Sequence, residues 1–347
     1  MADLKRPDNL REYLERENPG ALADCVEFEY AATPTERNRA SHLVHQILRT
    51  DSPFIRSTDE RDGLPDSPVD IVVHMGCHSI KTPHTIDAIV GTLKALDFTV
   101  VPIGGFNNCC GIGHVVDGDF ETAERIDANR FRNIEAFSPE YLITECTSCH
   151  VNTTNLSMGY REPDFELVSL NEFLYRHRSR IADHMVETEP TSVFLHHHYK
   201  FADRFEAMPF DHRESARRLF SSLPGVELLE HNCSEDEIRS CRHYDDAIAV
   251  WENAADLGAD VLISFWHGCD RRLEWHESDY PCETMNYVTF IAERLGYRYE
   301  NIGKRYKAWG KAGDIEKIVE HSRPVFEAND LSEAEARDVI MTHFVSP

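Results

Sequence analysis

Short apolar segments recur in the two halves of this 347-residue chain at a spacing of about 120 residues. They fall at residues 71–73, 98–103 and 141–144, and again at residues 193–195, 226–229 and 260–263. Helical patterns separate them, and strands that alternate with helices are typical of a parallel α/β layer. Because the whole pattern repeats, the sequence predicts an internal duplication, with two tandem parallel α/β repeats.

The predicted organisation has four parts, each with its own pattern. They are a helical N-terminal extension and linker (1–68), a first repeat (69–185), a second repeat (186–297) and a helical C-terminal tail (298–347). The extension contains a capping box at Thr33 and Glu36, and the tail contains another at Ser332 and Glu335. We expect the tail helices to pack on the core or on a partner.

Charge narrows the range of partners. The chain has 61 Asp and Glu against 36 Lys and Arg, a net charge of −25, which repels nucleic-acid phosphates and anionic lipids. The most apolar window, residues 88–106, contains Lys94 and Asp97, so direct membrane insertion is not expected. Ten cysteines behind a polar N-terminal segment indicate reduced thiols in the cytoplasm, used for metal binding or catalysis rather than for disulfides.

Half of the cysteines follow the three predicted strands of the first repeat. They are Cys77 after the first strand, Cys109 and Cys110 after the second, and Cys146 and Cys149 after the third. The carboxyl ends of parallel strands meet at one edge of a sheet, where open α/β folds build their sites. We therefore expect these five thiols to converge.

Five converging thiolates suit a soft metal centre. An iron–sulfur cluster is favoured over a single zinc ion, because zinc is saturated by four ligands whereas Cys109 and Cys110 can bind different irons. A mononuclear zinc site and a set of buried free thiols remain alternatives. The chain has no ferredoxin-type cysteine run and no Gly-rich phosphate loop, so a ferredoxin-like iron–sulfur or flavoprotein subunit would have to supply electrons.

The pattern Cys77…Cys109-Cys110-Gly111…Cys146-x-x-Cys149 resembles the CCG cysteine-rich domain. That domain occurs in the cysteine-rich subunit of heterodisulfide reductase, in the iron–sulfur subunits of glycolate and lactate oxidation, and in some succinate dehydrogenase subunits. The resemblance covers about residues 69–297, in two tandem copies. It implies that the five cysteines of the first copy hold one 4Fe-4S cluster, which is noncubane in the heterodisulfide reductase branch. It further implies that a small disulfide or related sulfur substrate is reduced with electrons from a partner subunit.

Two other functions fit the same cysteines. One is an electron-transfer subunit of a flavin-linked hydroxyacid dehydrogenase, of the glycolate or lactate type, or of a succinate dehydrogenase. The other is a non-enzymatic, zinc-stabilised assembly module. Sulfur chemistry predicts a cluster whose spectrum responds to thiol or disulfide, electron transfer predicts one that does not, and the assembly module predicts zinc or no metal.

Three histidines of the first repeat are candidates for proton transfer. They are His78, His114 and His150, each close to one of the five cysteines in the sequence. Because histidine titrates near neutrality, such a side chain could protonate a departing thiolate. The alternative for each is a hydrogen bond to a cluster sulfur or to water.

The second repeat retains few of these cysteines, so a second five-thiolate cluster cannot be built from it. The remaining candidate ligands have the types that tetrahedral zinc prefers. They are His198, Cys233 or Cys241, His267 and Cys269. The alternative is a repeat that survives as a scaffold closing over the first cluster.

Overall fold

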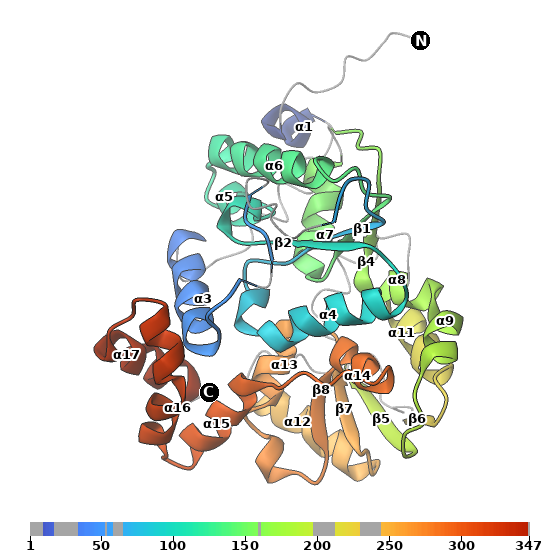
Figure 1. The fold of residues 1–347 in the computed structure, drawn as a ribbon, viewed down its shortest axis with the longest axis vertical. Coiled ribbons are helices and arrows are strands. Elements are labelled where there is room, and N and C mark those ends of the chain that lie inside the picture. The colour runs from blue at the N-terminus through green and yellow to red at the C-terminus, as the bar shows by residue number, and fades with distance from the viewer. Residues whose placement is uncertain are drawn as a thin grey trace. The chain divides into compact units, whose positions relative to one another are not determined.

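The computed structural model describes residues 10–16, 34–52, 54–57, 65–158, 161–196, 212–229 and 244–345. Within these residues lie two four-stranded parallel sheets with surrounding helices (Figure 1). The predicted α/β fold class is confirmed, and helices are present toward both ends of the chain. No described helix has the length and apolar character needed to cross a bilayer.

The first sheet has the strand order β2-β1-β3-β4, with all neighbours parallel. Its strands are β1 (Ile71–His74), β2 (Val100–Ile103), β3 (Tyr141–Thr144) and β4 (Glu166–Ser169). Every residue of β1 is buried, as expected for a central strand covered on both faces. Because β1 lies between β2 and β3, the three strands that precede the cysteines are neighbours and end at one edge.

The second sheet repeats this topology with the order β6-β5-β7-β8, again all parallel. Its strands are β5 (Thr191–His196), β6 (Val226–Leu229), β7 (Val261–Ser264) and β8 (Glu283–Asn286). In each sheet the first strand of the set is central, and the second and third strands flank it. The shared strand order agrees with the predicted duplication.

The chain divides into two compact units, one around each sheet. Residues Phe54–His78 and Phe98–Leu170 belong to the first unit, whose helical elements include α1 (Leu10–Arg16), η2 (Phe106–Asn108), α5 (Ile112–Val116), α6 (Phe120–Glu135), α7 (Thr147–Asn152) and the π-helical turn η3 (Thr153–Ser157). Asp119 begins α6, because its side chain accepts a hydrogen bond from the backbone N–H of Thr122. The apolar side of α6 packs through Phe131 and Ile134 against Val72 of β1 and Leu142 of β3 in one core cluster.

The second unit includes residues Ser79–Asp97 and Asn171 onward. Its helical elements include η1 (Ser79–Lys81), α4 (Pro83–Ala95), α9 (Arg178–His184), α11 (His212–Ser221), α12 (Tyr244–Asp256), α13 (His267–Leu273), η6 (Glu277–Asp279) and α14 (Tyr287–Arg294), while α8 (Leu170–Arg176) begins at the boundary. Helix α4 connects β1 to β2 in sequence, yet it packs along α14 (Figure 1). In the core of this unit Trp251 stacks on Tyr280, and its indole N–H donates to the carbonyl oxygen of Leu273 at 3.0 Å.

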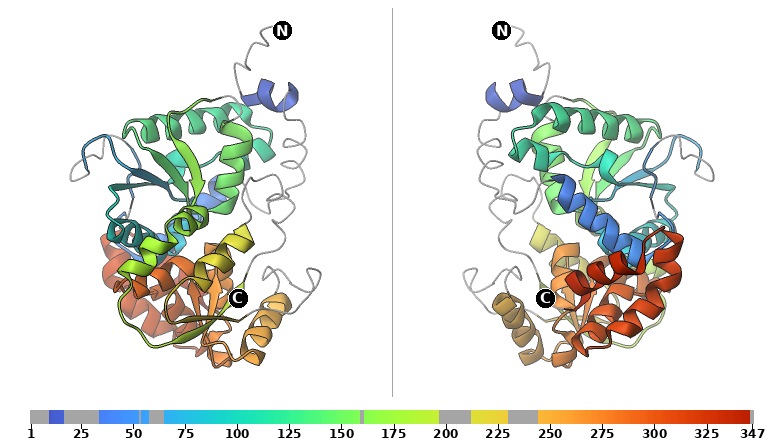
Figure 2. Two further views of the ribbon diagram at one scale, coloured as in Figure 1. Left: turned by 90° about the vertical axis from the view of Figure 1, so that its right-hand side faces the viewer. Right: turned by 90° about the vertical axis from the view of Figure 1, so that its left-hand side faces the viewer.

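Three C-terminal helices, α15 (Ile302–Lys311), α16 (Ile315–Ala328) and α17 (Glu333–Phe344), pack together (Figure 2). Their shared core includes Val44, Ile47 and Leu48 of α3 (Pro34–Leu48). The predicted capping box at Ser332 and Glu335 is present at the start of α17. The tail therefore packs against an N-terminal helix of its own chain.

Candidate metal centre

The five cysteines of the first repeat form one continuous row at the carboxyl edge of the first sheet. Thiol-to-thiol contacts run from Cys77 to Cys109, then to Cys110, Cys149 and Cys146. All five are free thiols, and Cys110 and Cys149 are buried while the other three are half-buried. The row thus has a buried middle and more accessible ends.

The buried middle of the row favours a thiolate at Cys110. The pKa of Cys110 lies well below its ordinary value, because it receives hydrogen bonds from Cys109 and Cys149 and lies near Arg130. The same hydrogen bonds to Cys110 hold the pKa values of Cys109 and Cys149 well above their ordinary range. The negative charge of a thiolate at Cys110 is therefore stabilised by hydrogen bonds from Cys109 and Cys149 and by the positive charge of Arg130.

Asn108 fixes the loop that carries the adjacent cysteines. Its buried amide donates to the carbonyl oxygens of Gly104 at 2.7 Å and Arg56 at 3.0 Å, and its side-chain oxygen accepts from Asn133 at 2.7 Å. Gly111 then turns the chain into α5 with φ of +78°, a left-handed conformation that favours glycine. These contacts give Cys109 and Cys110 a defined position after β2.

A buried arginine lies behind the cysteine row. Arg130 of α6 is fully buried, and its guanidinium donates to Asp127 at 2.5 Å, Thr153 at 2.8 Å and Ser157 at 2.9 Å. Arg161 also donates to Asp127, at 3.1 Å. Two guanidinium groups therefore share one carboxylate, and Arg130 places a positive charge close to Cys110 and Cys149.

Two further polar side chains lie close to Cys110. Asn152, at the end of α7, has its amide nitrogen 3.7 Å from the sulfur of Cys110. His74, at the end of β1, is fully buried, and its Nε2 lies 2.5 Å from the carbonyl oxygen of Asn108 while its Nδ1 has no hydrogen-bond partner within the described residues. Burial, with a contribution from Arg130, lowers the pKa of His74 to about 4, so this imidazole is neutral at pH 7.

The sequence places His74 beside Cys77, but it singles out neither Asn152 nor Arg130 as a site residue. Arg130 and Asp127 lie on the buried side of α6 together with Ala123 and Ile134, at helical spacing. A complementary pair of charges on an otherwise apolar helix face is the one sequence signal that could have identified them.

The three predicted proton-transfer histidines occupy different surroundings in the first unit. His78 Nδ1 lies 2.9 Å from the hydroxyl of Ser41, and the Nδ1 of His114 lies 3.6 Å from the carboxylate of Asp119. His150 is buried, with Nδ1 2.7 Å from the hydroxyl of Thr144. A proton-transfer role for any of the three stays a prediction.

The candidate zinc ligands of the second repeat are only partly described. His198, Cys233 and Cys241 lie outside the described residues. Cys269 is buried in a core cluster that includes Trp251, and His267 is half-buried at the first position of α13. A zinc site in this repeat stays a prediction.

Comparison with known proteins bears on the first repeat. The chain matches no curated protein. Residues 71–153, however, match the CCG cysteine-rich domain family. The matched stretch begins with β1 and contains all five cysteines of the row. This part of the chain is therefore a CCG cysteine-rich domain, a type associated with iron–sulfur or metal binding in redox proteins.

Proposed function

We propose that the chain is an iron–sulfur oxidoreductase subunit in which Cys77, Cys109, Cys110, Cys146 and Cys149 hold one 4Fe-4S cluster, cubane or noncubane. The observation that carries this proposal is the continuous row of five sulfur atoms at one sheet edge. Four ligands saturate a zinc ion, so five neighbouring thiols match a cluster of several irons better than a single ion. Such a cluster, when bound, supplies electrons one at a time.

The surroundings of the row fit an anionic group. The positive charge of Arg130, which lies close to Cys110 and Cys149, compensates thiolate charge. The amide of Asn152 donates to the sulfur of Cys110, and hydrogen bonds to ligand sulfurs are one of the means by which proteins set the potential of a cluster. The chain's own contribution is thus to hold five sulfurs and to balance their charge.

We propose sulfur chemistry as the reaction, by resemblance to the cysteine-rich subunit of heterodisulfide reductase. Reduction of a disulfide takes two electrons and two protons and yields two thiols. A ferredoxin-like iron–sulfur or flavoprotein subunit would supply the electrons. Among the candidate proton donors His78 and His114 are half-buried, whereas His150 is buried. We favour His114 of the first two, because it faces the carboxylate of Asp119.

Metal analysis with spectroscopy tests this proposal. Anaerobically purified protein is expected to contain about four irons and four labile sulfides per chain. Cys110→Ser should lose the iron, whereas Cys282→Ser, which replaces a buried cysteine in the core of the second unit, should keep it. An electron paramagnetic resonance signal that changes on addition of thiol supports sulfur chemistry.

Two outcomes would redirect the proposal. A full complement of iron with a spectrum indifferent to thiol and disulfide would assign the chain to electron transfer for a flavin-linked dehydrogenase. Zinc without labile sulfide would overturn both redox functions and leave the assembly module.

A further inference from the structure

Three buried side chains of metal-ligating type converge in the second unit. They are His84 of α4, Asp270 of α13 and Glu274, which caps the end of α13. One ligand atom from each lies within 4.8 Å of the others. Their exposed fractions are 5%, 1% and 6%, so the group is almost completely removed from solvent.

Asp270 has a buried carboxylate oxygen that a bound cation would satisfy. Its Oδ1 accepts a hydrogen bond from the hydroxyl of Ser264 at 3.1 Å, but its buried Oδ2 has no hydrogen-bond partner within the described residues. The nearest imidazole nitrogen, His84 Nε2, is 3.8 Å from that oxygen, too far for a hydrogen bond. A buried carboxylate oxygen left in this state is costly.

The spacing and the surrounding hydrogen bonds suit a bound ion. Two ligands of a tetrahedral ion with bonds of about 2.0–2.1 Å lie roughly 3.3 Å apart, and His84 Nε2 and Asp270 Oδ2 are separated by only slightly more. Donors also orient both carboxylates, since Ser264 donates to Asp270 and Asn301 donates to Glu274 at 2.5 Å. Such outer hydrogen bonds are usual around metal ligands.

Two cations already lie near this group. The ammonium of Lys307 pairs with Glu274 and also donates to the carbonyl oxygen of Arg271 at 2.7 Å. The guanidinium of Arg271 interacts with Glu274 and with Asp270. Neither cation donates a hydrogen bond to Asp270 Oδ2. The alternative to a bound metal ion is that these two cations alone balance the charge of the two carboxylates, and the experiment below distinguishes the two explanations.

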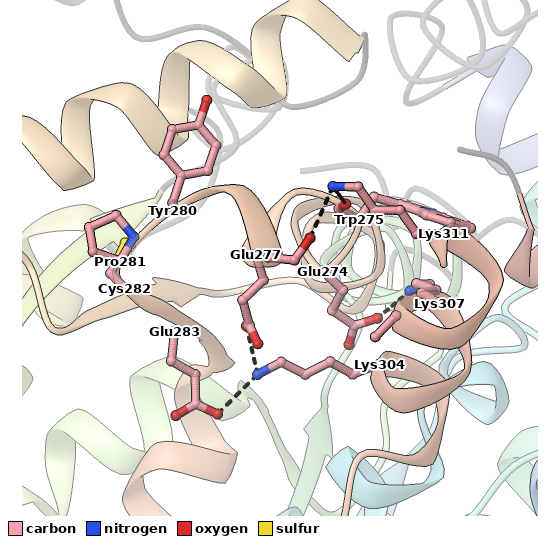
Figure 3. Close-up of a pocket in the computed structure, with 12 residues that line it drawn as sticks. Glu274, Trp275, Glu277, Tyr280, Pro281, Cys282, Glu283, Lys304, Lys307 and Lys311 are labelled. Atoms are coloured by element: carbon pink, nitrogen blue, oxygen red, sulfur yellow. Dashed lines mark hydrogen bonds and ion pairs between the residues drawn. The ribbon is translucent and has the colours of Figure 1, made fainter. Parts of the chain in front are cut away.

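A cavity borders this group at Glu274. Glu274 and Lys307 line a cavity of about 390 Å³, together with Lys304 and Lys311 (Figure 3). In Figure 3 the ammonium of Lys304 lies between Glu277 and Glu283 and pairs with both. The carboxylates on this wall lower the barrier that the lysines would otherwise present to an entering cation.

We propose that His84, Asp270 and Glu274 form a binding site for one first-row divalent cation, such as Zn²⁺ or Mn²⁺. One imidazole nitrogen and two carboxylate oxygens are a donor set that both ions accept, and three protein ligands leave a position for water. The site uses none of the five cysteines and does not rest on the proposed iron–sulfur function.

Titration with Mn²⁺ in the presence of excess Mg²⁺ tests the site. Binding is measured as the loss of the electron paramagnetic resonance signal of free Mn²⁺. The full-length protein, whatever its iron content, should bind one Mn²⁺ per chain, and its melting temperature should rise. Asp270→Asn and His84→Gln should each weaken binding by about tenfold or more, the loss typical of impaired metal sites. Glu283→Gln, an acid of the same cavity outside the triad, should bind as the wild type does.

Iron content is measured on the same samples and should be equal in all of them. If the wild type binds no stoichiometric Mn²⁺, or if binding persists in both triad variants, the site is refuted and Lys307 and Arg271 are the counter-charges of this group. Because Asp270→Asn alters a core residue, far-UV circular dichroism checks its fold, and His84→Gln on a separate helix gives an independent result.

Discussion

The guanidinium of Arg130 donates a 2.8 Å hydrogen bond to the hydroxyl of Thr153, the residue at which α7 passes into a π-helical turn. That hydroxyl in turn donates to the carbonyl oxygen of Cys149 at 2.6 Å. Arg130 also donates to Ser157 at the other end of the turn. One buried side chain of α6 therefore fixes the segment that carries the last two cysteines of the row.

Arg130 therefore has two roles that can be tested separately. Its hydrogen bonds hold the turn in place, and its charge acts on the cysteines. A π-helical turn departs from the regular hydrogen-bond pattern of an α-helix, and Arg130 donates a hydrogen bond to a side chain at each end of this one. The same guanidinium supplies a positive charge close to Cys110 and Cys149. Reduction of a bound cluster adds negative charge, so a buried cation stabilises the reduced form and raises the reduction potential.

Replacement of Arg130 is therefore expected to lower the reduction potential of the cluster. For Arg130→Met we expect a fall of tens of millivolts, since about 1.4 kcal/mol corresponds to about 59 mV in a one-electron couple. Arg130→Lys should remain closer to the wild type because it keeps the charge. Potentiometric titration monitored by electron paramagnetic resonance measures the change.

The matched control for this prediction is Arg132→Met. Arg132 is exposed on the same helix, where it donates to Asn129, so its removal changes net charge equally without touching the buried network. Solvent screens a charge at such a position. Equal potentials for Arg130→Met, Arg132→Met and the wild type, at full iron content, would contradict the electrostatic role.

Much of the fold could be predicted from sequence because the central strands are short, continuous apolar runs. Segments such as Ile71–His74 and Val261–Ser264 are buried throughout, and their pattern is unambiguous. The edge strands β4 and β8 could not be predicted in this way, because Glu166–Ser169 and Glu283–Asn286 mix polar and apolar residues and are exposed at their first residue.

The cysteine row could also be predicted. Its five cysteines each follow one of three strands, and the carboxyl ends of these strands lie side by side in the sheet. Arg130 is not predicted by the same reasoning, since a charged residue in a charged helix is expected to face solvent. His84 of α4 and Asp270 of α13 lie far apart in sequence, and the packing of the second unit brings them together. That packing follows from tertiary structure and leaves no local pattern.

Asn108 should prove necessary for cluster retention. Asn108→Ala removes two hydrogen bonds donated to Gly104 and Arg56 and leaves Asn133 without its acceptor. Each buried polar group left unsatisfied costs about 1–3 kcal/mol, so the loop of Cys109 and Cys110 should lose its fixed position. Iron content per chain should fall.

The neighbouring residue provides the control for the loop. Asn107 is exposed, and its backbone oxygen rather than its side chain accepts from Asn129. Asn107→Ala should therefore keep its iron. Full iron in Asn108→Ala would show that the loop is held by other contacts.

Two glycines of α15 should respond to alanine in opposite ways. A Cβ at Gly310 would lie 1.7 Å from the carbonyl oxygen of Phe344, so Gly310→Ala forces α15 and α17 apart. Overpacking of this kind costs about 1–3 kcal/mol of unfolding free energy. A Cβ at Gly303 meets nothing closer than 3.5 Å, so Gly303→Ala should be neutral or stabilising by up to about 1 kcal/mol. Urea unfolding compares the two variants, and equal stabilities would refute the close packing of α15 on α17.

Stability should depend on pH through His343 of α17. Burial, with contributions from Lys81, Arg271 and Lys307, lowers the pKa of His343 to about 4, against an ordinary value of 6.5. As the pH falls below 6.5 the unfolded chain takes up a proton that the folded chain takes up only near pH 4, so folding stability is full above pH 6.5 and is lost progressively toward pH 4. His343→Gln should reduce the decline in unfolding free energy between pH 6.5 and pH 4, measured by urea unfolding at intervals across that window.

The control for this prediction is Met341→Gln, a neutral exchange at an exposed position of the same helix, which should leave the decline unchanged. If His343→Gln and the wild type decline equally, other groups carry the acid sensitivity of this helix.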